Sequence, residues 1–127
     1  MPSDTTPSKR RDAGTPPPWD FQVEVHVSNG RHTLCLGGDL DLASVPELQA
    51  AIRRLIVDAN ELVIDLEDLS FIDSTGLRCI LACQSACERA GIAFLMTRGK
   101  SHVMRLFEIT GMLGRLPFTE ETTVCTP

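Results

Sequence analysis

The sequence predicts an α/β fold: one domain with a mostly parallel central sheet, an N-terminal antiparallel hairpin and about four helices. Three observations predict this fold. Two strand-like segments flank an Asn-Gly pair, short apolar runs typical of interior strands follow, and a helical pattern separates each strand from the next. A helix between two strands of one sheet implies a right-handed crossover and parallel pairing.

The hairpin is expected at the start of the domain. Every second residue from 21 to 27 is apolar, which is the pattern of a half-buried strand. Asn29-Gly30 follows, and this pair is a strong signal for a tight turn. The returning strand is expected over residues 31–36, with a loop over residues 37–41.

The first crossover helix is expected to begin at Ser44. Ser44 and Glu47 have the spacing of a capping box, and Pro46 is tolerated in a first helical turn. Apolar residues at helical spacing continue to position 56. The apolar run 62–66 then predicts an interior parallel strand.

The second crossover helix is expected to begin within residues 73–75, all good N-cap types, and to continue to Ala90. Gly91 stands where a left-handed C-terminal cap belongs, and residues 92–96 form another short strand. A third helix opens at Ser101 and ends at Gly111. Residues 113–118 add a last helical turn and an edge strand.

Composition bounds the domain organisation and excludes several function classes. Residues 1–18 are rich in Pro, Ser and Thr and predict a disordered tail, residues 19–119 the folded domain, and residues 120–127 a flexible C-terminal tail. The net charge of −5 argues against nucleic-acid binding, and no apolar run approaches the roughly 18 residues of a membrane span. Five Cys without framework spacing predict reduced thiols and a cytoplasmic location.

The sequence contains no nucleotide-binding glycine motif, no histidine spacing typical of a metal site and no base for a nucleophilic serine. His26 and His32 lie on facing strands, but two ligands do not make a site. An alternative is a Mg²⁺ site in an acidic set near the strand ends. That set comprises Asp39, Asp41, Asp65, Asp68 and Asp73. We expect no metal and no cofactor.

Three cysteines recur at a spacing of four in the second crossover helix: Cys79, Cys83 and Cys87. This spacing keeps them near one helical face. A metal or redox role is conceivable, but free cysteine is among the most buried residue types. We therefore interpret them as small apolar residues of the helix packing.

The tetrapeptide Asp73-Ser74-Thr75-Gly76 is by itself a helix start. Residues 63–66 and 71–77 together, however, resemble the signature of the STAS domain, which sulphate transporters and anti-sigma factor antagonists share. Residues 38–41 and 105–111 resemble the two other recurring blocks of that family, at compatible distances. The three blocks span most of the predicted domain.

The resemblance implies an anti-sigma factor antagonist, a binding protein and not an enzyme. Ser74 matches the serine that an anti-sigma factor with serine kinase activity phosphorylates in such antagonists. The unphosphorylated form would bind this partner and release a sigma factor, and a PP2C-like phosphatase would reset the switch. The expected partner-binding residues are Asp39, Asp41, Asp73, Ser74, Thr75, Gly76 and Arg78.

Two other hypotheses remain at this point. A non-switching STAS scaffold would bind partners regardless of charge at Ser74, with self-association as a weak homodimer, and a metal-dependent enzyme would bind Mg²⁺ through Asp39 or Asp73. Thr75 is interpreted as a capping or packing residue, with modification of its hydroxyl as the alternative.

Overall fold

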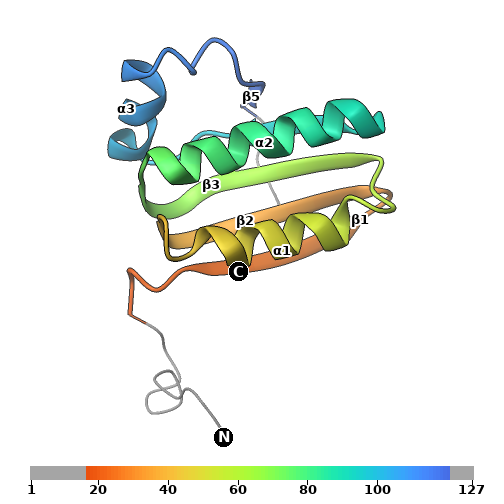
Figure 1. Cartoon of the computed structure of the whole chain (residues 1–127), viewed down its shortest axis with the longest axis horizontal. Coiled ribbons are helices and arrows are strands. Elements are labelled where there is room, and N and C mark those ends of the chain that lie inside the picture. Colours follow the sequence, from red (N-terminus) through yellow and green to blue (C-terminus); the bar gives the residue numbers. More distant parts are fainter. Residues whose placement is uncertain (1–16, 121–127) are drawn as a thin grey trace, which may run out of the picture.

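The computed structural model describes residues 17–120, which form one sheet with helices packed against it (Figure 1). The elements in chain order are β1 (Gln22–Ser28), β2 (Arg31–Leu40), α1 (Val45–Leu55), β3 (Glu61–Ile72), α2 (Ser74–Ala90), β4 (Ala93–Thr97), α3 (Ser101–Ile109) and β5 (Phe118–Thr119).

The sheet has five strands in the order β1-β2-β3-β4-β5. β1 and β2 pair in antiparallel fashion, and the other neighbouring strands are parallel. Asn29 and Gly30 both have positive φ, as the predicted tight turn requires. The predicted mostly parallel sheet with an N-terminal hairpin is therefore confirmed.

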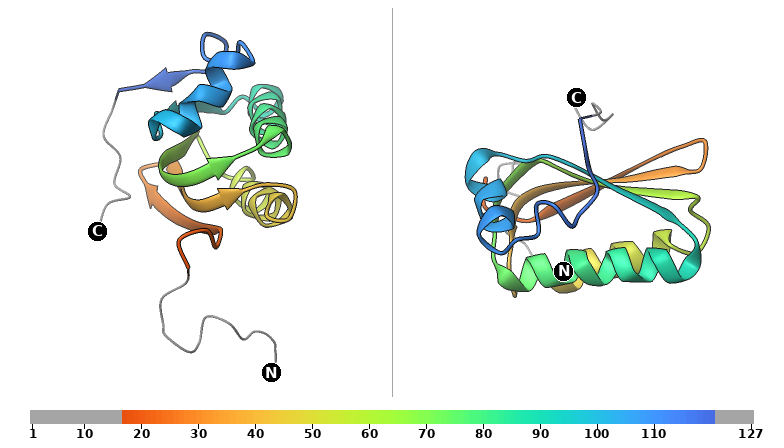
Figure 2. Two further views of the ribbon diagram at one scale, coloured as in Figure 1. Left: turned by 90° about the vertical axis from the view of Figure 1, so that its left-hand side faces the viewer. Right: turned by 90° about the horizontal axis from the view of Figure 1, so that it is seen from above.

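One face of the sheet is covered by α1 and α2, which run side by side from the same end (Figures 1 and 2). The buried strand residues on this face include Leu34, Leu62, Ile64 and Met96, none of which is accessible to solvent. They share one core with the buried side chains of α1 and α2. α3 lies at the end of the sheet where α1 and α2 begin (Figure 2).

The prediction of about four helices is wrong for the described residues, which contain three. Residues 112–116 make only one turn, in which the Arg115 and Leu116 amides donate to the Met112 carbonyl. Pro117 has no N–H to donate and so cannot continue that turn. The expected edge strand is present as β5.

β2 and β3 are longer than the sequence predicts. β2 ends at Leu40 and not at residue 36, and β3 covers Glu61–Ile72 and not only residues 62–66. β2 continues to Leu40 because two register shifts let it pair again with the second half of β3. Gly38 lies between the shifts with φ 78°, and a Cβ there would stand 2.2 Å from the Asp20 carbonyl oxygen. Asp39 is therefore a strand residue and not a loop residue.

The predicted tails fall almost entirely outside the described residues, so both remain predictions. Among residues 17–120, the structure contains no helix long and apolar enough to cross a membrane.

Candidate functional site

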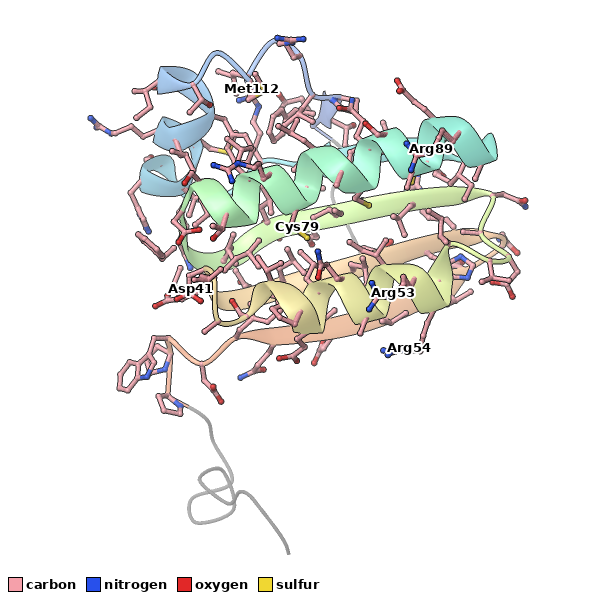
Figure 3. All side chains as sticks on the ribbon, in the orientation of Figure 1. Asp41, Arg53, Arg54, Cys79, Arg89 and Met112 are labelled. Atoms are coloured by element: carbon pink, nitrogen blue, oxygen red, sulfur yellow. The ribbon has the colours of Figure 1, made fainter. Side chains whose placement is uncertain are left out.

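The candidate site lies at the carboxyl ends of β2 and β3. Leu40 and Ile72 are paired across these parallel strands, so the residues that follow them, Asp41 and Asp73, emerge at the same edge of the sheet. The Asp73 amide also donates to the Leu40 carbonyl, 3.2 Å away. Figure 3 shows Asp41 at the end of the molecule where α1 and α2 begin.

Asp73 is the N-cap of α2. Its Oδ1 accepts hydrogen bonds from the Gly76 amide at 3.0 Å and from the Thr75 hydroxyl. Burial acts to raise the pKa of this carboxyl, but the hydrogen bonds from Thr75 and Gly76 outweigh it and hold the pKa below its ordinary value. Asp73 is therefore an ionised cap at neutral pH.

Ser74 is the first residue of α2 and is exposed. Within the described chain, its hydroxyl takes part in no hydrogen bond, because Asp73 satisfies the first amides of the helix. Arg78, one turn further along α2, is exposed as well. Thr75 is half-buried, and its hydroxyl donates to the Asp73 carboxylate, so Thr75 supports the cap while Asp73 is the capping residue.

Gly76 is buried where α2 approaches β2 most closely. A Cβ at this position would stand 2.8 Å from both the side chain and the carbonyl oxygen of Leu40, and 3.0 Å from the Ile72 side chain. The glycine therefore lets the start of α2, including Ser74, sit directly against the ends of the two strands.

The loop before α1 is organised by Asp41, whose Oδ1 accepts from the Ala43 and Ser44 amides. The predicted capping box is wrong: the Ser44 hydroxyl donates to the Asp39 carbonyl at 2.8 Å instead of capping the helix. The Asp41 carboxylate thus holds two amides of the loop itself, and the Ser44 hydroxyl ties the same loop to β2.

A cavity of about 340 Å³ opens beside this loop, and four carboxylates line it: Asp20, Asp39, Asp41 and Glu47. The structure thus brings Asp39 and Asp41 together, at the edge of the sheet where Asp73 and Ser74 lie. The four carboxylates give the site a strongly acidic border.

Three exposed apolar side chains lie at this edge and were missed from the sequence. Trp19, in the chain before β1, is 64% exposed and lines the acidic cavity. Leu42, in the loop after β2, is 73% exposed, and Phe71, paired with Asp39, is 46% exposed. For Leu42, the sequence did contain a signal of this exposure, because it is a leucine inside a polar loop. Exposed apolar groups of this size beside polar ones are typical of protein-binding surfaces.

The acidic set predicted from the sequence is only partly assembled. Asp65 is buried in β3, where its Oδ1 accepts from the Thr97 hydroxyl at 2.7 Å. Within residues 17–120, no group of three or more His, Cys, Asp or Glu side chains could hold a metal ion. His26 and His32 pair with Thr33 and Val27, positions of opposite parity, so they point to opposite faces of the sheet.

The cysteines of α2 pack as small apolar residues. Cys79, Cys83 and Cys87 are free and buried, and burial raises the pKa of each thiol. Cys35 differs from them because it is disulfide-bonded. The prediction that all cysteines are reduced is therefore wrong for Cys35.

Comparison with known proteins gives one family match, described as STAS domain, over residues 22–123. A curated relative, the anti-sigma-B factor antagonist of Staphylococcus aureus strain NCTC 8325, is 27% identical over 106 residues. That alignment covers 83% of this chain and 98% of the relative.

Two solved structures share the fold. An anti-sigma factor antagonist from Mycobacterium paratuberculosis superposes with a TM-score of 0.73 and 23% identity, covering 83% of this chain and 90% of the other. The Bacillus cell fate determinant SpoIIAA in its phosphorylated form superposes with a TM-score of 0.63 and 24% identity, covering 81% of this chain and 92% of the other.

Proposed function

The chain belongs to the STAS domain family, and from that premise we propose that it is an anti-sigma factor antagonist switched by phosphorylation of Ser74. In its unphosphorylated form it binds an anti-sigma factor that is also a serine kinase, and a sigma factor is released. Phosphorylation of Ser74 by that partner ends the binding, and a PP2C-like phosphatase restores it.

The observation that carries this proposal is the state of the Ser74 hydroxyl. It is exposed at the first position of α2, and Asp73 rather than Ser74 caps the helix. Transfer of a phosphoryl group to this oxygen therefore breaks no hydrogen bond within the described chain. The helix N-terminus favours a negative group, so the modified domain stays folded.

The same modification changes the surface that a partner would meet. A phosphoserine adds about −1.5 to −2 charge at neutral pH. That charge would join an edge of the sheet that already carries Asp39, Asp41 and Asp73. A partner surface that fits the neutral hydroxyl would have to bury this charge unpaired, at a cost of several kcal/mol.

The exposed apolar groups supply the contacts that such a charge would interrupt. Trp19, Leu42 and Phe71 present large apolar side chains at the same edge of the sheet. Apolar anchors beside polar groups are the usual core of a protein interface. Each loss of about 1.4 kcal/mol weakens an affinity tenfold, so an unpaired phosphate is sufficient to release the partner.

The test is affinity capture from a lysate of the source cells with wild-type, Ser74→Ala and Ser74→Asp proteins as baits, followed by mass spectrometry. Ser85→Asp is the matched control, because Ser85 is another exposed serine of α2 far from its N-terminus. Wild type, Ser74→Ala and Ser85→Asp should retain an ATPase-type kinase that Ser74→Asp loses. Retention of the same proteins by all four baits would favour a non-switching STAS scaffold instead.

The captured kinase then tests the assignment of the modified residue. With ATP it should phosphorylate the wild type and Thr75→Val, whose residue 75 keeps its shape but loses its hydroxyl, and it should leave Ser74→Ala unmodified. Phosphate on Ser74→Ala but not on Thr75→Val would move the modification to Thr75.

A further inference from the structure

β1 leaves one edge of the sheet open. It stands first in the strand order, and within residues 17–120 only β2 pairs with it (Figure 1). Its seven residues pair with β2 without a register shift and include no proline or lysine, although bulges, prolines and lysines commonly protect a sheet edge. The opposite edge, β5, is only two residues long. β1 is therefore the edge to which a further strand can add.

The backbone groups at this edge belong to three valines. Ser28 and Arg31 flank the two-residue turn of the hairpin, and a pair in that position exchanges both of its backbone hydrogen bonds. Such pairs alternate along an antiparallel ladder, so every second residue of β1, counted back from Ser28, is bonded to β2. The amide and carbonyl groups of the residues between them, Val23, Val25 and Val27, therefore point away from β2.

The side chains of β1 form an apolar row and a charged row. Val25 pairs with the buried Leu34 and so lies on the face that α1 and α2 cover, but Val25 and Val27 remain 41% and 61% exposed. Glu24 and His26 alternate with the valines and point to the other face. There, His26 Nε2 lies 3.6 Å from Glu24 Oε1, and the two side chains are 39% and 68% exposed. β1 thus presents exposed valines on one face and an exposed acid–histidine pair on the other.

The sequence of β1 is complementary to itself when two copies run antiparallel. If Val25 lies opposite Val25 of a second copy, Val23 faces Val27 and Glu24 faces His26, each in both directions. Directly opposite residues point to the same side of a sheet, so valine meets valine on one face and acid meets histidine on the other. We propose that two copies of this chain associate through antiparallel pairing of their β1 strands, about a two-fold axis at Val25.

Backbone and side chains select the same register. With the axis at Val25, the outward amides of the three valines face outward carbonyls of the second copy and can donate to them. Glu24 and His26 then form non-hydrogen-bonded pairs, in which opposite side chains come closest. A slip by one residue would oppose outward groups with inward ones. A slip by two would set Glu24 against Glu24, where like charges repel, or His26 against His26, where neither meets an opposite charge.

The association joins the two sheets into one and covers the valines of both copies. The surface is one strand edge with a row of side chains on each face, which is typical of a weak and transient interface rather than an obligate one. The dimer therefore forms reversibly and depends on the protein concentration. It uses no residue of the candidate site, so it does not depend on the proposed function.

Sedimentation equilibrium of the full chain tests the surface. Val25→Lys places two ammonium groups opposite each other at the axis, and Val25→Pro removes an amide that β2 does not use. Val57→Lys is the matched control, because Val57 is 81% exposed and lies outside the sheet. Wild type and Val57→Lys should dimerise equally, and both Val25 variants should weaken dimerisation by about tenfold or more while circular dichroism stays unchanged. A wild type that is monomeric at every concentration, or folded Val25 variants that dimerise like it, would overturn the proposal.

Exchange of the two charged side chains tests the register. His26→Glu should weaken the dimer, because it places a second carboxylate opposite Glu24. Glu24→Lys combined with His26→Glu restores opposite charges across the axis and should restore dimerisation. A double variant that dimerises no better than His26→Glu alone would contradict the register.

A cysteine at the axis locates the contact directly. The Cα atoms of a hydrogen-bonded pair lie about 5.5 Å apart, within the range of a disulfide. Oxidised glutathione should therefore link two copies of Val25→Cys through residue 25, and trypsin should release the peptide 12–31 joined to itself. Val57→Cys should give no such dimer. A Val25→Cys protein that stays monomeric, or a Val57→Cys protein that is linked as readily, would contradict the axis at Val25.

Discussion

Replacement of Asp73 by alanine tests how the Ser74 hydroxyl is left free at the start of α2. The substitution removes the acceptor for the Gly76 amide and the Thr75 hydroxyl. Loss of an N-cap acceptor costs about 1 kcal/mol, and loss of a negative charge at a helix N-terminus costs a further ~0.3–1 kcal/mol. Asp73→Ala should therefore lower the free energy of unfolding by about 1–2 kcal/mol.

Urea denaturation and calorimetry measure this loss. For a domain of this size, about 1–2 kcal/mol corresponds to a fall of roughly 5–10 °C in the unfolding midpoint. Asp73→Asn keeps an acceptor oxygen and should lose only the charge contribution. Asp68→Ala, which removes an exposed carboxylate from β3, is the matched control. A loss in Asp73→Ala no larger than that in Asp68→Ala would refute the capping account.

The pH dependence gives the cap a second signature. Because the hydrogen bonds lower the pKa of Asp73, its carboxylate stabilises the fold at pH values above the pKa of the unfolded state, near 3.8. This stabilisation is lost as the pH falls through the lower pKa of the folded state. The difference in stability between wild type and Asp73→Asn should therefore shrink below about pH 4. A difference that stays constant into acid would contradict the ionised cap.

Three further substitutions test other parts of the account. Gly76→Ala should lower the free energy of unfolding in urea by about 1–3 kcal/mol, because the new Cβ would overlap β2. Gly114→Ala is the control and should cost far less, since a Cβ there has no neighbour within 4 Å. Equal losses of stability in the two variants would contradict the close approach of α2 to β2. The free energy of unfolding of Ser74→Asp, measured by calorimetry, should lie within about 1 kcal/mol of the wild-type value, since a helix N-terminus accepts negative charge. An unfolded Ser74→Asp protein would show that the switch acts through unfolding. Thr97→Val should cost about 1–3 kcal/mol because buried Asp65 loses a hydroxyl donor, and an unchanged denaturation midpoint would show that this bond adds nothing.

The elements that local chemistry dictates were predictable from the sequence. Asp73 and Gly91 bound α2 because an Asx side chain can accept from the first amides and glycine alone adopts the left-handed cap easily. The hairpin was predictable from Asn29-Gly30, because these two residue types readily adopt the positive φ that a tight turn requires. Each of these signals depends on residues adjacent in the chain.

The features that depend on distant parts of the chain were not predictable. β2 extends to Leu40 only because it keeps pairing with β3 through two shifts of register. The Ser44 hydroxyl was expected to cap α1, but it donates instead to the carbonyl of Asp39, a residue of β2. The disulfide of Cys35 left no trace in the spacing of the cysteines, since spacing alone does not define connectivity.

The most direct test of the central claim is an affinity measured against a purified kinase partner obtained by capture. Isothermal titration would compare unphosphorylated protein with protein phosphorylated stoichiometrically at Ser74, each at two salt concentrations. The account predicts that the phosphate weakens binding by about 10²-fold or more, the equivalent of roughly 3 kcal/mol. Equal affinities for the two forms would contradict it, because Ser74 would then carry no switch.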